Sequence, residues 1–291
     1  MTEFTEYPYP ITPLIGLNIL ITGCNRGIGL GLVKRLLNVH GTTVVGTCRN
    51  PEEAVEIKQL VEEYGSKRLV ILRLNTTSMH ELEELRKTIR SHGIEHLDII
   101  IANAGVGSKN HPFDPAMGSP EDDMMNTFRT NTLGTVFTVQ AMAPLISMSK
   151  RGKLFLTMSG RQASIEETAG VGGLMSFRMS KAAMNMACMT LAQDPTLASY
   201  GVRVLCMDPG NVATRFVSPP PVSPPPALPV RWYRSEHVSI PCPCLISVGM
   251  SVVMVGVNGW GGGVCGGFAY VCGGYGGGGG GTCLCVAWWV W

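Results

Sequence analysis

Short apolar runs recur along the first 216 residues, and each is separated from the next by a longer amphipathic segment. The runs lack the in/out alternation of a strand with one solvated face, so they indicate a sheet that is covered on both sides. Between them, apolar residues such as Ile28, Leu32 and Leu36 repeat at helical spacing. Because strands and helices alternate, we predict an α/β fold with a parallel sheet between two helical layers (αβα) and right-handed crossovers. The predicted strands are Asn18–Thr22, Thr43–Thr47, Leu69–Leu74, Leu97–Ala102, Leu154–Met158 and Arg203–Met207.

A glycine-rich turn with the sequence TGCNRGIG follows the first predicted strand directly. Glycines permit a tight turn, let the backbone approach a pyrophosphate, and allow the strand and the next helix to pack closely. The N-terminal N–H groups and the positive dipole end of that helix then point at the phosphates. Because the turn opens a βαβ unit, it predicts a Rossmann-type, doubly wound sheet that binds a dinucleotide. The candidate binding residues of the turn are Thr22, Gly23, Asn25, Arg26, Gly27, Ile28 and Gly29.

The residues after the second predicted strand favour one dinucleotide. NAD sites usually place an Asp or Glu about 20 residues after the glycines, to bind the ribose 2′-hydroxyl. Here the sequence from Thr47 reads TCRN, with no acid before Pro51. Arg49 and Arg26 can pair instead with a 2′-phosphate, because the planar guanidinium fork suits phosphate, so the predicted cofactor is NADP(H). A helix is predicted to begin at Pro51, with Asn50 as its N-cap.

The composition changes abruptly after Val217. Residues 218–230 are proline-dense, which excludes a helix or a central strand. No Asp, Glu, Lys or Arg occurs from His237 to Trp291, and the apolar run Cys244–Val257 is shorter than the roughly 20 residues of a membrane-spanning helix, so we expect no membrane insertion. The predicted organisation is an N-terminal extension at 1–14, a Rossmann domain at 15–217, and an irregular Pro/Gly-rich tail at 218–291 that is predicted to be disordered.

Cysteine placement and charge narrow the class of function. The α/β domain contains four scattered cysteines, predicted to be small buried hydrophobes: Cys24, Cys48, Cys188 and Cys206. The other six of the ten lie after residue 240 without the spacing typical of zinc sites, so no metal is predicted. The formal net charge of +2, with no basic cluster, predicts no nucleic-acid partner. The first 13 residues lack the basic start and apolar run of a secretory signal, so we expect a cytoplasmic location with reduced cysteines.

Further motifs follow in order along the chain: Asn103-Ala104-Gly105 after the fourth predicted strand, Asn131, Ser159, Lys181 and Pro209-Gly210. Together with the TGxxxGxG turn, they resemble those of the short-chain dehydrogenases/reductases. The segments CRNP at 48–51 and RMSKAAMN at 178–185 are most similar to the sniffer and C-factor branch of carbonyl reductases. The resemblance covers roughly residues 15–216. Beyond it, the family's last strand and helix, which help to shape the substrate pocket and dimer contacts, have no visible counterpart.

The resemblance implies contacts with the cofactor. Asn103, Ala104 and Gly105 would support the central sheet and line the adenosine side. Asn75, at the end of the third predicted strand, stands where the family commonly has an Asp that contacts the adenine. The residues that would flank the nicotinamide and its carboxamide are Pro209, Gly210 and Thr214.

The resemblance also implies the catalytic residues. Lys181 would contact the nicotinamide ribose and lower the pKa of a catalytic tyrosine, Asn131 would hold a water in the proton relay, and Ser159 would hydrogen-bond the substrate carbonyl. The tyrosine should lie four residues before the lysine, where this chain has Phe177, and no tyrosine occurs in residues 65–199. Carbonyl reduction needs a proton at oxygen as hydride reaches carbon, and a phenyl ring cannot deliver one. Loss of a general acid typically costs on the order of 10²–10⁴ in rate.

Three hypotheses for function stay open at this point. The first is an NADP(H)-dependent oxidoreductase that reduces a small aldehyde, ketone or quinone. The second is a non-catalytic NADP(H)-binding protein that has lost the acid, and the third is a non-functional product whose missing C-terminal elements expose the pocket and the sheet edge. A run of methionines is predicted to fill a core or a helix–helix interface of a homodimer: Met175, Met179, Met184, Met186 and Met189.

Overall fold

The computed structural model describes residues 15–109, 114–165, 172–209 and 212, together with short strands at 252–253, 271–273 and 282–284. Its strands are β1 Asn18–Thr22, β2 Thr43–Cys48, β3 Leu69–Arg73, β4 Ile99–Ala102, β5 Leu154–Met158, β6 Arg203–Met207, β7 Val252–Val253, β8 Val271–Gly273 and β9 Thr282–Leu284. Its α-helices are α1 Gly27–Leu37, α2 Val55–Tyr64, α3 Met79–Ser91, α4 Glu121–Phe128, α5 Gly134–Ser147, α6 Met175–Ala192 and α7 Pro195–Ser199. Two 3-10 turns, η2 Pro51–Glu53 and η4 Arg161–Ala163, and a π-helical segment, η3 Arg129–Leu133, complete the elements.

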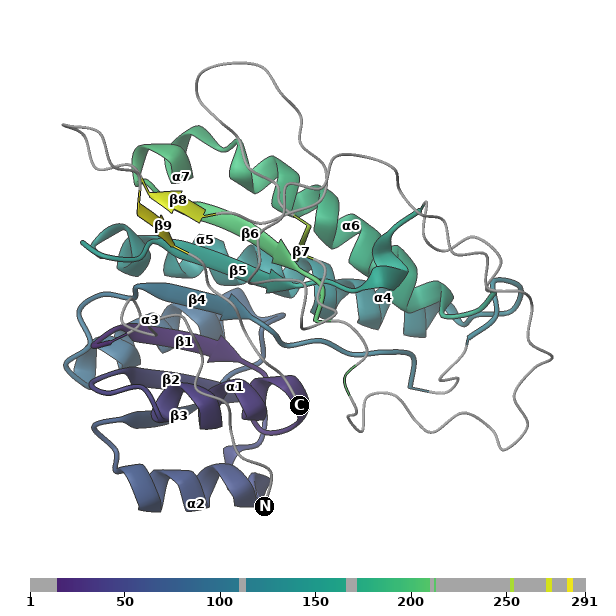
Figure 1. The fold of residues 1–291 in the computed structure, drawn as a ribbon. Helices are drawn as coiled ribbons and strands as arrows, with labels where there is room; N and C mark the ends of the chain where they lie inside the picture. The colour runs from purple at the N-terminus through teal and green to yellow at the C-terminus, as the bar shows by residue number, and fades with distance from the viewer. Residues whose placement is uncertain are drawn as a thin grey trace, which may run out of the picture.

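The main sheet has the strand order β3-β2-β1-β4-β5-β6-β7 (Figure 1). The strands β1 to β6 pair in parallel, and β7 adds to β6 in the antiparallel direction. The order reverses beside β1, as in dinucleotide-binding doubly wound sheets, and ligands of such sheets bind outside the carboxyl ends of the strands at this point. The predicted Rossmann-type parallel sheet is therefore confirmed.

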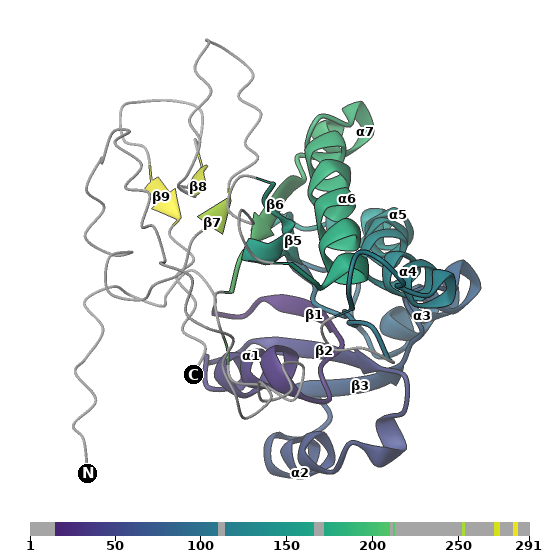
Figure 2. The same cartoon turned by 90° about the vertical axis from the view of Figure 1, so that its right-hand side faces the viewer.

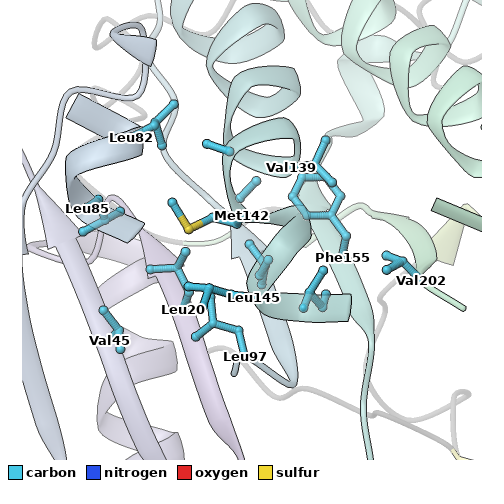
Figure 3. Packing of buried hydrophobic residues seen from close by; sticks show 14 of the residues in the cluster. Leu20, Val45, Leu82, Leu85, Leu97, Val139, Met142, Leu145, Phe155 and Val202 are labelled. Carbon is cyan, nitrogen blue, oxygen red and sulfur yellow. The ribbon is translucent and has the colours of Figure 1, made fainter. Parts of the chain in front are cut away.

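The apolar core is divided by the sheet into two clusters. Helices α1 and α2 pack on one face, while α3, α5 and α6 pack on the other (Figures 1 and 2). Figure 3 shows the second cluster, where Phe155 of β5 and Leu20 of β1 lie under side chains of α3 and α5 such as Leu82 and Met142. Because both faces are covered, the strands are mainly apolar on both faces, which explains why the sequence runs show no alternation.

Three strand boundaries differ from the prediction. β2 ends at Cys48, one residue late, β3 ends at Arg73, one residue early, and β4 begins at Ile99, two residues late. The backbone N–H of Leu97 donates to Leu145 O at 3.2 Å, outside the sheet ladder. Tertiary hydrogen bonds therefore compete with the ladder at this end of β4.

The segment after β2 also differs from the prediction. A 3-10 turn, η2, begins at Pro51, and α2 begins only at Val55. The side chain of Asn50 makes no cap hydrogen bond and donates instead to Glu53 Oε2 at 3.2 Å. Asn50 is therefore the N-cap residue of this turn by position, as predicted, but its side chain does not cap the turn.

The C-terminal segment contributes little to the described part of the chain. β7 extends the sheet at β6, and β8 and β9 form a separate two-stranded sheet. The rest of residues 218–291 lies outside the described residues, so disorder of the tail stays a prediction. No helix in the described part is both long and apolar enough to cross a membrane.

Candidate active site

The glycine turn connects β1 to α1 through backbone conformations that other residues rarely adopt. Gly23 has φ +69° and Gly27 has φ +56°. A Cβ atom on Gly23 would lie 2.8 Å from Ala104 Cα, and one on Gly29 would overlap a backbone oxygen of the turn and lie 2.6 Å from Asn103 Nδ2. Side chains at these positions would fill or distort the turn, so the glycines keep its backbone open to a ligand.

The first turn of α1 faces the same opening. Arg26 is the N-cap residue, it makes no side-chain cap hydrogen bond, and no acidic residue lies in the first turn. The N–H groups of Gly27, Ile28 and Gly29 have no acceptor within the helix, because the first four amides of a helix never do. With the positive end of the helix dipole, they form an anion-binding site that fits the pyrophosphate of a dinucleotide.

The segment after β4 lies against this turn. Asn103 Nδ2 donates to the backbone oxygens of Thr22 at 2.9 Å and Gly23 at 3.0 Å. Thr22 Oγ1 accepts from the backbone N–H groups of Asn103 and Ala104 at 3.1 and 3.0 Å. A Cβ atom on Gly105 would lie 3.3 Å from Asn131 Oδ1. The segment therefore links the glycine turn to the catalytic candidates.

The residues proposed for the adenosine end follow β1, β2 and β3. Arg26 and Arg49 are exposed, and Asn25 lies beside Arg26 in the turn. Asn75 Oδ1 accepts from the backbone N–H of Thr77 at 3.2 Å, and its own backbone N–H donates to Glu81 Oε2 at 2.9 Å. Asn75 thus closes the turn that leads into α3.

Lys181 and Phe177 lie one turn apart on α6. Lys181 is buried, its Nζ donates to Met158 O at 2.5 Å, and it lies 5.8 Å from the centre of the Phe177 ring. Burial lowers the pKa of the Lys181 ammonium from 10.5 to about 8. A Cβ atom on Gly160 would lie 3.9 Å from Phe177 Cε1, so the ring lies beside the residue that follows Ser159. The residue at the position predicted for the acid therefore lies near Lys181 and Gly160, and its ring carries no hydroxyl.

Asn131 lies in the π-helical segment η3 and is fully buried. Its side chain exchanges hydrogen bonds with the backbone of Val106 at 2.8 and 2.9 Å, and its Nδ2 also donates to Ser180 Oγ at 2.9 Å. An extra residue in a helical turn is frequent at functional sites. Here it places the amide between the segment after β4 and helix α6.

Ser159 follows β5, and its hydroxyl is hydrogen-bonded to a residue of α6. Its hydroxyl donates to Asn185 Oδ1 at 2.7 Å, and Cys206 Sγ donates to the same oxygen at 3.1 Å. Asn185 ends the RMSKAAMN segment and is not among the predicted site residues. Its position four residues after Lys181, on the same helix face, is a signal that could have found it.

Three predicted positions lie beyond β6. Pro209 is half-buried and follows β6 after one residue, whereas Gly210 and Thr214 lie outside the described residues. Within the described ranges, no group of three or more His, Cys, Asp or Glu residues could hold a metal ion.

The predictions for cysteine and methionine can be compared with the structure. The predicted burial of the cysteines in the α/β domain is confirmed for Cys24, Cys48, Cys188 and Cys206. Of the five methionines predicted to fill a core or an interface, only Met184 is buried in the core, while Met179 and Met186 are 46% and 67% exposed. Core packing therefore explains one of these side chains, and the predicted homodimer interface stays a prediction.

A protein-family model described as short chain dehydrogenase matches residues 17–220. The match spans more than half of the chain, so the chain belongs to the short-chain dehydrogenase family. Among related proteins, the short chain dehydrogenase gsfK of Penicillium aethiopicum is 29% identical over 198 residues, 67% of this chain and 76% of that protein. Norsolorinic acid ketoreductase of Aspergillus parasiticus is 27% identical over 215 residues, 73% of this chain and 77% of that protein.

Solved structures that are similar to the chain include carbonyl reductases. The NADPH-bound carbonyl reductase from chicken fatty liver is 26% identical, with a TM-score of 0.63 over 70% of this chain and 83% of that chain. The carbonyl reductase Sniffer of D. melanogaster is 28% identical, with a TM-score of 0.62 over 69% of this chain and 83% of that chain. The resemblance to the sniffer branch is therefore confirmed.

Proposed function

We propose that the chain binds NADP(H) across the carboxyl ends of β1, β2 and β4. The observation that supports this most directly is the glycine turn, where a side chain on Gly23 or Gly29 would meet the backbone or Asn103. Arg26 and Arg49 would pair with the 2′-phosphate. The similar carbonyl reductase from chicken liver contains NADPH, which supports the same cofactor here.

We further propose hydride transfer to a small carbonyl compound, an aldehyde, ketone or quinone, as the reaction of this site. Bound NADPH would supply the hydride. Lys181 would hold the nicotinamide ribose, Ser159 would donate a hydrogen bond to the substrate oxygen, and Asn131 would hold a water in the proton relay. For Ser159 this requires its hydroxyl to turn away from Asn185, to which it donates in the structure. The residues proposed to flank the nicotinamide are Pro209, Gly210 and Thr214.

Phe177 favours a second function, NADP(H) binding without efficient catalysis. Its ring lies 5.8 Å from Lys181 Nζ, where the family has the phenol of its tyrosine. A phenyl ring has no proton to give, so the reaction would depend on Ser159 or solvent as the acid. The expected loss is on the order of 10²–10⁴ in rate, which leaves cofactor binding intact and turnover slow.

Comparison of the chain with Phe177→Tyr separates the two functions. NADPH oxidation is followed with a panel of aldehydes, ketones and quinones, and NADPH affinity is measured by fluorescence titration. We expect both proteins to bind NADPH and Phe177→Tyr to turn over on the order of 10²-fold faster or more. An increase below about tenfold would mean that residue 177 is not the acid position. Failure of both proteins to bind NADPH would leave the non-functional product as the remaining hypothesis.

A cytoplasmic location, a homodimer and a disordered 218–291 tail remain part of this proposal. Size-exclusion chromatography with light scattering tests the dimer directly. Partial proteolysis tests the tail, because a disordered segment is cleaved at low protease concentration while the α/β domain persists.

A further inference from the structure

A hollow of about 460 Å³ lies at the edge of the sheet, between the carboxyl ends of β2 and β3 and the turn η2. In Figure 1, β3 is the edge strand and α2 runs beside it. The residues that line the hollow are Arg49, Asn50, Pro51, Glu52, Glu53, Ile71, Leu72 and Arg73. Two arginines and two glutamates thus face the same space.

The two glutamates already have partners. Glu52 forms an ion pair with Lys58 at 3.4 Å, and Glu53 Oε2 accepts from Asn50 Nδ2 at 3.2 Å. Among the described residues, the side chains of Arg49 and Arg73 form no hydrogen bond or ion pair, and both residues are exposed. The hollow therefore offers two guanidinium groups without a protein anion.

Strand pairing places Arg73 close to the proposed cofactor site. Arg73 is opposite Cys48 in the parallel ladder, and Arg49 is the residue after Cys48. Paired residues of neighbouring strands point to the same face, so Arg73 shares the face of Cys48, which α1 and α2 cover. With Arg26 after β1, the adjacent strands β1, β2 and β3 each bring one arginine to the same end of the sheet.

We propose that Arg49 and Arg73 form a phosphate subsite in this hollow and that Arg73 is a specificity-determining residue for the 2′-phosphate of NADP(H). The inference rests on the proposed binding of NADP(H) and adds a residue from β3 to it. Two guanidinium groups can donate several charge-assisted hydrogen bonds to one phosphate, which NADH and 5′-ADP lack at this position. Arg73 would therefore discriminate between the two dinucleotides without touching the reacting end.

The test measures dissociation constants of NADPH, NADH, 2′,5′-ADP and 5′-ADP for the full chain and for Arg73→Gln. We expect Arg73→Gln to weaken NADPH and 2′,5′-ADP about tenfold, the effect of one lost hydrogen bond to a charged group, and to change NADH and 5′-ADP less than twofold. Lys67→Gln is the matched control, because it removes one exposed positive charge beyond the opposite end of β3 and should leave all four constants unchanged. Arg73 is exposed and unpartnered within the described residues, so Arg73→Gln is expected to fold, which circular dichroism checks.

The outcomes distinguish failure of the phosphate subsite from failure of the proposed NADP(H) binding. If the unmodified chain binds NADPH and Arg73→Gln binds it equally well, the subsite is wrong while the proposed cofactor stands. Equal weakening of NADPH and NADH also overturns the subsite, because the effect would not depend on the 2′-phosphate. If the unmodified chain binds neither NADPH nor 2′,5′-ADP, the proposed cofactor and the subsite fail together.

Discussion

Replacement of Lys181 by methionine should make the free energy of unfolding less dependent on pH. Lys181 is buried, and burial lowers the pKa of its ammonium from 10.5 to about 8 in the folded state. Each pKa unit corresponds to about 1.4 kcal/mol, so this lowering of the pKa means that the charged lysine destabilises the fold by roughly 3 kcal/mol. Methionine keeps a similar length of apolar chain and removes the charge, although it also removes the hydrogen bond to Met158 O.

The direction of the pH dependence follows from the two pKa values. Between about pH 8 and pH 10.5, the lysine of the unfolded chain is protonated while that of the folded chain is not. The unfolded state then binds more protons, so the contribution of Lys181 to the free energy of unfolding rises with pH in this window. Below about pH 8 both states are charged, and the full penalty is present.

Denaturant unfolding of Lys181→Met and of the unmodified chain between pH 7 and pH 10.5 measures the effect. The difference in free energy of unfolding, variant minus unmodified chain, should be constant below about pH 8 and fall by roughly 3 kcal/mol by pH 10.5. Lys67→Met is the control, because it makes the same substitution at an exposed lysine. A pH-independent difference for Lys181→Met would refute the assignment of a buried, desolvated ammonium.

Three further predictions concern the cofactor site and the core. Gly29→Ala should abolish measurable NADPH binding, because its Cβ would lie 2.6 Å from Asn103 Nδ2. Gly31→Ala on the same helix has open space around its Cβ, so this control should bind NADPH normally and gain about 0.5–1 kcal/mol in stability. If fluorescence titration finds the same NADPH affinity for both variants, the proposed role of the turn is contradicted. Arg49→Asp should weaken NADPH at least about tenfold more than NADH in the same titration, and equal weakening counts against a 2′-phosphate contact. Phe155→Ala should lower the free energy of unfolding by about 3–5 kcal/mol, because the side chain is fully buried, and a loss below about 1 kcal/mol in denaturant titration would show that this core can collapse around the gap.

Local sequence patterns predicted the repeating elements well. Apolar runs mark buried strands directly, and β1, β5 and β6 have the predicted bounds. Errors lie at strand ends such as Ile99, where a backbone hydrogen bond joins Leu97 to Leu145, and at Asn50, whose side chain donates to Glu53 instead of capping the turn. A pattern along the chain contains no information about these partners.

Some residues of the candidate site were likewise predicted from the sequence, whereas others became apparent only in the structure. Gly29 was predicted from a local requirement, a missing Cβ in a tight turn, whereas Asn131 and Lys181 were predicted from the resemblance to the short-chain dehydrogenases/reductases. The hydrogen bond from Ser159 to Asn185 spans 26 residues, and the pairing of Arg73 with the end of β2 depends on strand order. Neither contact can be predicted from the sequence, because each depends on how the strands and helices pack together.

The sequence by itself determined an α/β fold with a glycine turn for a dinucleotide, and it determined that residue 177 has no hydroxyl. These properties follow from side-chain chemistry and short-range periodicity, which need no knowledge of distant contacts. Only the tertiary structure decided that Lys181 is buried enough to lower its pKa to about 8, and that the Phe177 ring lies above it. It also brought Arg73 beside Arg49 at the edge of the sheet. Burial and proximity depend on how the strands order and the helices cover them, and residues far apart in the chain set both.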